Sequence, residues 1–267
     1  KEGLIDQVIN YDNSLGTVYD ATEQLEQKQS VEIFFCALNM IQKLMDCPDV
    51  AIYRVNKEKY ARLFAYSSAK AASMGNTVYL PDKKSLDEAC NENRVYINRS
   101  MEKEYPMMAY NVESEEQMEI LIMLWSLPFE RMTINEANRL IVIGKLIQTS
   151  VRRADRYLEA LSEERYHSES QILKASAFEE LVGAYRKASK EKLTEYVLLQ
   201  IEVEGENEKE TVDKFTSMLR ESDYIGNLSD GKLYLLLTNT DLKGCSFVQN
   251  KLKQNGVASS ISEEGRL

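Results

Sequence analysis

One stretch near the end of the chain indicates the fold of its second half: Met218-Leu-Arg-Glu-Ser-Asp-Tyr-Ile-Gly-Asn-Leu-Ser-Asp-Gly-Lys-Leu-Tyr-Leu-Leu-Leu237. It starts as the end of an amphipathic helix, turns at Glu221-Ser-Asp223 and continues as a short strand. A reversal at Ser229-Asp-Gly-Lys232 then leads into the apolar run Leu233–Leu237. Turn residues between two strand-like runs are typical of a β-hairpin, so we predict a hairpin that is entered from a helix.

Arg220 and Asp223 lie where this helix ends, and their Arg-x-x-Asp spacing lets them face one point in space. A guanidinium group offers two parallel donors to O6 and N7 of a guanine, while a carboxylate accepts from the N–H groups of the base. The pair is therefore a candidate guanine-binding site. Glu221, Ser222 and Tyr224 are candidate neighbours that supply backbone or stacking contacts.

The same spacing occurs a second time, at Arg152 and Asp155. At i, i+3 positions of a helix we interpret this second pair as a surface ion pair. An exposed ion pair is also the alternative for Arg220 and Asp223, and the position of that pair just before the hairpin favours binding.

Length and charge limit the classes of function. The 267 residues predict about two domains, and no apolar run approaches the ~20 residues of a membrane helix. A net charge of -10 argues against a general DNA or RNA binder. An anionic ligand would need a local basic cluster. Because the chain starts at Lys1, we expect further segments upstream, a membrane anchor among them.

The cysteines and the histidine predict neither a metal site nor a catalytic site. Four cysteines without a C-x-x-C pair are typical of free thiols: Cys36, Cys47, Cys90 and Cys245. The only histidine, His167, lies in a polar run that we interpret as a solvated helix face. Nothing near it completes a triad or a zinc ligand set.

The first half of the chain predicts an α+β domain between helices. A helical stalk is expected over 1–27, and a helix with a Thr133–Glu136 capping box is expected to continue past Arg156 towards Lys174. Between them we expect helices at 31–45 and 86–91, and strand-like segments at 50–55, 60–66, 79–80, 95–97, 107–112 and 118–125. This order of elements over 28–150 resembles a GAF domain.

GAF domains often hold small molecules, and some hold cyclic nucleotides. The Asn-Lys-Phe-Asp-Glu set of cyclic-nucleotide GAF domains is not found in this sequence. Five tyrosines could line a pocket, although aromatic residues on strands more often belong to a core: Tyr53, Tyr60, Tyr66, Tyr79 and Tyr96. We favour a structural or dimerising role for this half, and a small-molecule sensor is the alternative.

The second half predicts a β-α-β-β-α-β order, typical of a ferredoxin-like α/β sheet. After a helix at 178–188, strands are expected at 196–203, in the hairpin and at 257–261, with helices at 208–219 and 242–254. The segment 175–267 resembles a GGDEF domain, the fold of diguanylate cyclases, and 151–174 is then a connecting helix.

In GGDEF domains, an Arg-x-x-Asp element before the signature hairpin is an inhibitory site that binds cyclic di-GMP. The resemblance places Gly231 and Lys232 at the two acidic signature positions, where a cyclase needs carboxylates for divalent ions. The chain from Glu202 and Glu204 to Arg220 is also too short for the base-reading segment. The resemblance, with these two differences, implies a degenerate domain without enzymatic activity. A relic cyclase is the alternative.

A GAF domain followed by a degenerate GGDEF domain resembles PelD-like cyclic di-GMP receptors, which are inner-membrane proteins of Pel exopolysaccharide export and biofilm formation. In cyclases a second arginine follows the hairpin, and Lys251 stands at that position, with Lys253 a weaker candidate. The resemblance implies cyclic di-GMP as ligand, no cofactor, other components of a Pel-type synthase as partners and a cytoplasmic location at the membrane. A homodimer is a further expectation, and a ligand-free interaction scaffold is the alternative.

Overall fold

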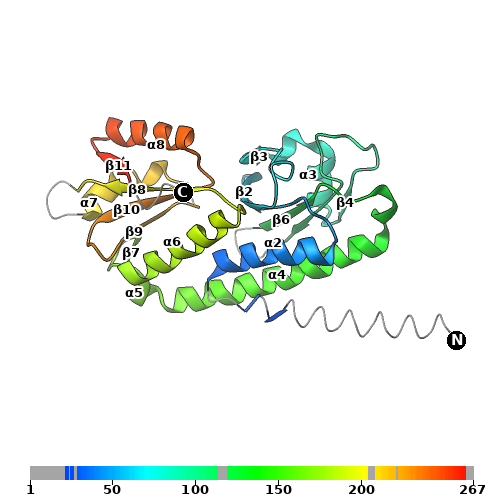
Figure 1. Ribbon diagram of the computed structural model, residues 1–267, viewed down its shortest axis with the longest axis horizontal. Helices are drawn as coiled ribbons and strands as arrows, with labels where there is room; N and C mark the ends of the chain where they lie inside the picture. Colours follow the sequence, from blue (N-terminus) through cyan, green and yellow to red (C-terminus); the bar gives the residue numbers. More distant parts are fainter. Residues whose placement is uncertain are drawn as a thin grey trace. The chain divides into compact units, whose positions relative to one another are not determined.

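The chain forms two compact units, Lys1–Asp155 and Arg156–Leu267 (Figure 1). The structure is a computed structural model, and it describes residues 22–23, 25–26, 29–113, 119–203, 208–220 and 222–262. The helical stalk expected over 1–27 lies almost entirely outside these ranges. Within them, no helix is long and apolar enough to cross a membrane.

The first unit is built on a six-stranded antiparallel sheet in the order β3-β2-β1-β6-β5-β4. β1 lies in the middle of the sheet and pairs with both β2 and β6. The strands are β1 Val50–Val55, β2 Tyr60–Tyr66, β3 Thr77–Tyr79, β4 Tyr96–Ile97, β5 Met108–Val112 and β6 Glu119–Leu124. The strand segments predicted from hydrophobic alternation are confirmed to within two residues.

Alternating residues of this sheet build two apolar layers. Tyr53, Leu63 and Trp125 belong to a buried cluster that includes α3 (Lys84–Asn91). On the other face, α2 (Ser30–Leu44) packs its Phe34 ring 4.6 Å from Phe64. Of the five tyrosines considered above, Tyr53 and Tyr96 are buried, Tyr66 is half-buried, and Tyr60 and Tyr79 are exposed.

The long helix α4 (Ile134–Ala160) begins as predicted, because Thr133 Oγ1 accepts from the Glu136 N–H at 3.3 Å. The prediction that it continues to Lys174 is wrong. It is followed by the short α5 (Ser162–Arg165) and by strand β7 (Ile172–Leu173). The two apolar residues of β7 are buried, and they gain strand pairing beside β9 that a helix would not give them.

This change also moves His167 off the predicted helix face. Its N–H donates to Ile172 O at 2.9 Å, and its Nε2 lies 2.9 Å from Asn227 Oδ1. The histidine therefore lies in the turn before β7 and connects it to strand β9, and it is exposed as predicted although it is not on a helix.

The second unit contains a five-stranded sheet in the order β11-β8-β10-β9-β7. Its strands are β8 Tyr196–Ile201, β9 Tyr224–Asn227, β10 Leu233–Thr238 and β11 Ser259–Ile261, with β7 added at one edge. Without β7, the sheet order is β11-β8-β10-β9, and each neighbouring pair is antiparallel. In chain order these are the fourth, first, third and second strands. This is the ferredoxin-like arrangement predicted from the element order, and the α+β fold class is confirmed.

Helices cover both faces of this sheet (Figure 1). α8 (Leu242–Gln254) and α7 (Glu208–Asp213) pack on one face, where Phe215, Cys245 and Leu252 join the strand core. α6 (Ala175–Lys190) covers the other face. The helix predicted over 208–219 is shorter: α7 ends at Asp213 and a 3₁₀ turn, η3 (Thr216–Met218), follows. Thr216 Oγ1 donates to Val212 O at 2.7 Å, a side-chain bond that competes with continuing the helix.

Candidate functional site

The hairpin between β9 and β10 closes through a tight turn with one left-handed residue. The Gly231 N–H donates to Leu228 O at 2.9 Å, and Leu228 N–H donates to Lys232 O at 3.2 Å. Gly231 has φ +75°, which glycine adopts without steric cost. The pattern is a turn followed by a left-handed glycine, one of the common hairpin connections. It fixes where β9 ends and β10 begins, and the resulting register places Tyr224, at the start of β9, opposite Leu236.

The Arg220–Asp223 turn is held by the carboxylate of Asp223. Its Oδ2 accepts from the backbone N–H of Arg220 at 3.2 Å, and its Oδ1 accepts from the backbone N–H of Thr238 at 3.2 Å. The Asp223 N–H in turn donates to Arg220 O at 3.0 Å. These bonds fix the carboxylate between the turn and the end of β10.

Thr238 is a part of the turn that the sequence analysis missed. Its hydroxyl donates to Ser222 O at 3.0 Å, in addition to the backbone bond to Asp223. The available signal was the polar residue that ends the apolar run Leu233–Leu237. In the hairpin register Leu236 pairs with Tyr224, so the residues that follow Leu236 meet those that precede Tyr224.

The Arg220 side chain is exposed beside this turn. Only its backbone contacts Asp223, and within the described ranges its guanidinium makes no ion pair. The alternative of an exposed Arg220–Asp223 ion pair is therefore wrong for this structure. Glu221, between them, lies outside the described residues.

The other two predicted site residues lie on opposite faces of the sheet. The Tyr224 ring is 6.4 Å from the ring of Tyr185, which belongs to α6. Lys251 is on α8, and its Nζ lies 4.7 Å from the ring centroid of Phe247. The structure therefore brings Arg220, Ser222 and Asp223 together, while the Tyr224 ring packs under the turn on the α6 side.

The end of α8 nevertheless lies close to the chain that enters the turn. Asn255, one helical turn after Lys251, donates to Met218 Sδ at 3.0 Å and to Lys251 O at 2.9 Å. Met218 precedes Arg220 by two positions. Lys251 is thus on the helix that borders the turn, and its flexible side chain can reach away from Phe247.

The signature-loop positions carry a carboxylate that is already hydrogen-bonded. Asp230 accepts from the Lys232 N–H at 3.0 Å and from the Tyr234 hydroxyl at 2.7 Å. The Lys232 N–H is the main reason that the pKa of Asp230 is lowered from its ordinary value. No group of three residues able to hold a metal ion occurs in the described part of the chain.

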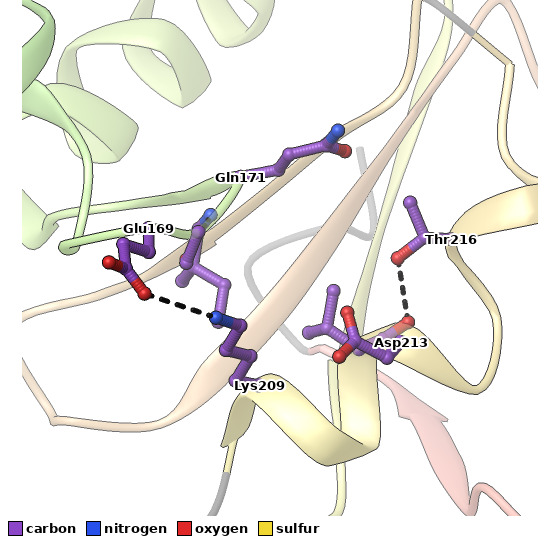
Figure 2. A pocket seen from close by; sticks show the side chains of 8 residues that line it. Glu169, Gln171, Lys209, Asp213 and Thr216 are labelled. Carbon is purple, nitrogen blue, oxygen red and sulfur yellow. Dashed lines mark hydrogen bonds and ion pairs between the residues drawn. The ribbon is translucent and has the colours of Figure 1, made fainter.

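A hollow of about 370 Å³ lies between α7 and the chain before β7 (Figure 2). Lys209 reaches across it, and its Nζ lies 3.9 Å from Glu169 Oε2. Asp213 and Thr216 contribute further polar groups to the wall. Because the charge of Lys209 is balanced by Glu169, this hollow is not the basic cluster that an anionic ligand requires.

No protein-family model matches this chain, and no curated protein sequence matches it. Among solved structures, PelD of Pseudomonas aeruginosa is similar over 92% of this chain and 89% of its own length, at 12% identity and a TM-score of 0.40. PelD in complex with c-di-GMP is similar over 85% of this chain and 79% of its own length, at 13% identity and a TM-score of 0.36. A methyl-accepting chemotaxis protein fragment covers 53% of this chain and 99% of its own length, at 6% identity and a TM-score of 0.42.

PelD structures are thus similar to most of this chain, as the order of elements also indicated. Identities and TM-scores at this level do not carry binding residues from those structures to this one. The site must therefore be argued from the turn itself.

Proposed function

We propose that this protein is a non-enzymatic receptor for cyclic di-GMP, which it binds at the turn Arg220–Asp223. The observation that supports this most is the fixed carboxylate of Asp223, held by the N–H groups of Arg220 and Thr238. An acceptor fixed before binding loses little conformational entropy when a ligand arrives. The side chain of Arg220, exposed beside it, supplies the donors.

The proposed contacts follow from the hydrogen-bond donors and acceptors on the edge of guanine. The Arg220 guanidinium donates to O6 and N7, while Asp223 accepts from the N–H groups of the base. A carboxylate has about four acceptor sites, so bonds to the backbone orient Asp223 and are compatible with a further donor. Ser222 and Glu221 belong to the same turn, and Tyr224 anchors it against α6.

Lys251 is the proposed phosphate contact. Its ammonium group lies on the Phe247 ring, and a phosphate within reach of α8 would attract it more strongly than the ring does. A lysine acts as a point charge and lacks the fork of an arginine. We therefore expect Lys251 to contribute less to affinity than Arg220.

The absence of cyclase activity is part of the proposal. Gly231 and Lys232 offer no carboxylate at the loop positions that would hold divalent ions in a cyclase. The nearest carboxylate, Asp230, is bonded to Tyr234 and Lys232. Incubation with GTP and Mg²⁺ is expected to give no dinucleotide, and formation of product would contradict this part of the proposal.

The proposed output is control of Pel-type exopolysaccharide export and biofilm formation, from the cytoplasmic side of a membrane. Binding can act only if one arrangement of the protein or of its complex binds the ligand more tightly than another. Partners are then other components of the synthase, and a homodimer is one such arrangement.

Titration calorimetry with cyclic di-GMP tests the receptor directly. The intact protein is expected to bind, and Arg220→Ala is expected to lose at least about tenfold in affinity because a charged bidentate contact is removed. Absence of binding by the intact protein would favour a ligand-free scaffold. Undiminished binding by Arg220→Ala would mean that the ligand binds elsewhere.

A further inference from the structure

A cationic and aromatic patch lies on the first sheet, on the face that carries α2. Alternation along β1 and β2 points Tyr53 and Leu63 into one buried cluster, and so points Arg54 and Arg62 to the other face. The Arg54 Cζ lies 5.9 Å from the ring centroid of Phe34 in α2. One side of the patch therefore borders α2 through the contact between Arg54 and Phe34.

The two arginines lie directly opposite each other. Arg54 of β1 is the register partner of Arg62 of β2, and both are partly exposed. Like charges at opposite positions of neighbouring strands are destabilising. Neither guanidinium forms an ion pair with a described carboxylate, although the chain contains 43 Asp and Glu. Two adjacent positive charges that no described carboxylate pairs with are suited to binding an anion.

Two stacked tyrosines continue the same face. Tyr60 is the register partner of Tyr79, their ring centroids are 4.9 Å apart, and they are 38% and 40% exposed. Tyr60 precedes Arg62 by two positions, so it lies on the same face, ~7 Å along the strand. The aromatic pair therefore borders the arginine pair at about the distance that separates a base from its phosphates.

From this juxtaposition we infer a second site, in the first unit, for a nucleotide. Arg54 and Arg62 hold its phosphate chain, because guanidinium groups bind phosphate oxygens in pairs. Tyr60 and Tyr79 stack with its base, which any base allows because each has a π-face. This site is separate from the turn at Arg220 and does not depend on the function proposed for that turn.

Titration with ATP and with inorganic pyrophosphate tests the site in the full chain. Adenine lacks the N1–H that Asp223 would accept, so ATP discriminates against the guanine site. We expect ATP to bind, and Arg54→Gln and Arg62→Gln each to weaken it about tenfold or more. The matched control is Arg99→Gln, an exposed arginine that follows β4 at the opposite edge of the same sheet.

Tyr60→Leu tests the contact with the base separately from the contact with the phosphates. It is expected to weaken ATP binding about three- to tenfold and to leave pyrophosphate binding unchanged. No ATP binding by the intact protein, or an equal loss in Arg99→Gln, would overturn the site. An unchanged ATP affinity in Tyr60→Leu would overturn the nucleotide assignment. Folding is checked by thermal unfolding, where Arg62→Gln should not lower Tm because it removes a like-charge pair.

Discussion

At the scale of single residues, Arg220 and Asp223 have different tasks. Asp223 holds the turn together through two backbone N–H groups, whereas the Arg220 side chain is exposed and makes no ion pair with a described residue. A change at Asp223 therefore alters both the fold and the site. A change in the Arg220 side chain leaves the backbone bond to Asp223 in place.

Arg220→Lys tests the fork of donors separately from the charge. We expect cyclic di-GMP affinity to fall about tenfold or more, since lysine cannot donate to O6 and N7 in parallel. The free energy of unfolding should change by less than ~0.5 kcal/mol, as for other surface substitutions. Calorimetry and chemical denaturation measure the two quantities. Full affinity in Arg220→Lys would show that charge alone is sufficient.

Lys251→Ala tests the phosphate contact, with Lys253→Ala as its matched control on the same helix. Both lysines are exposed on α8, and Lys251 is the one that lies over Phe247. We expect a loss of about three- to tenfold in cyclic di-GMP affinity for Lys251→Ala, and little change for Lys253→Ala. Equal effects in both variants would indicate general electrostatic attraction and remove Lys251 from the site.

At the scale of elements, close packing of α6 on β9 depends on Gly226. A Cβ at this position would lie 2.7 Å from Phe178 Cβ and closer still to its ring. Gly226→Ala is therefore expected to cost about 1–3 kcal/mol of unfolding free energy. Gly183→Ala in α6 is the control, because its Cβ would meet nothing within 4 Å, and it should add about 0.5–1 kcal/mol. Denaturant titration distinguishes these opposite signs.

The start of β1 carries a carboxylate network that makes stability depend on pH. Burial raises the pKa of Asp49, but hydrogen bonds from Ser126 and Ser68 outweigh burial and lower it below the ordinary 3.8. Its stabilising contribution is therefore complete above pH 3.8 and is lost as the pH falls through the lower, folded-state pKa.

Asp49→Asn tests this network. The variant is expected to be about 1–2 kcal/mol less stable than the wild type at pH 7. The difference should shrink as the pH falls below 3.8 and through the lower folded-state pKa, because the wild-type protein then loses the contribution of its ionised carboxylate. Unfolding measured as a function of pH checks the prediction, and a difference that is constant down to low pH would contradict it.

At the scale of the whole molecule, the two units contain separate sheets and separate cores. Binding of cyclic di-GMP at the turn should slow amide exchange at Arg220 and Thr238, whose N–H groups already donate to Asp223. Amide exchange in the strands β1–β6 should be the same with and without ligand. Hydrogen exchange with and without ligand measures this, and protection centred on the first sheet would place the ligand in the other unit.

Most elements could be predicted because their signals are local. The alternation in 50–66 and the helix start at Thr133 are present in short windows of sequence, and the structure confirms both. Of the capping box only the Thr133 half forms, because the Glu136 carboxylate pairs with Arg131 and Arg139. The prediction failed after Ala160, where two apolar residues, Ile172 and Leu173, become a strand only because β9 offers them a partner. Strand pairing between distant segments has no local signal.

The sequence by itself determined the α+β class, the hairpin and the residue types at its turn, since these depend on periodicity and on turn chemistry within a few residues. Only the tertiary structure decided what those residues do. It turned the Asp223 carboxylate into the link between the turn and Thr238, and it placed the Tyr224 ring under α6. It also set Arg54 against Arg62 across two strands. The physical reason is that a side chain's partners come from strand register and helix packing, which join residues far apart in the chain.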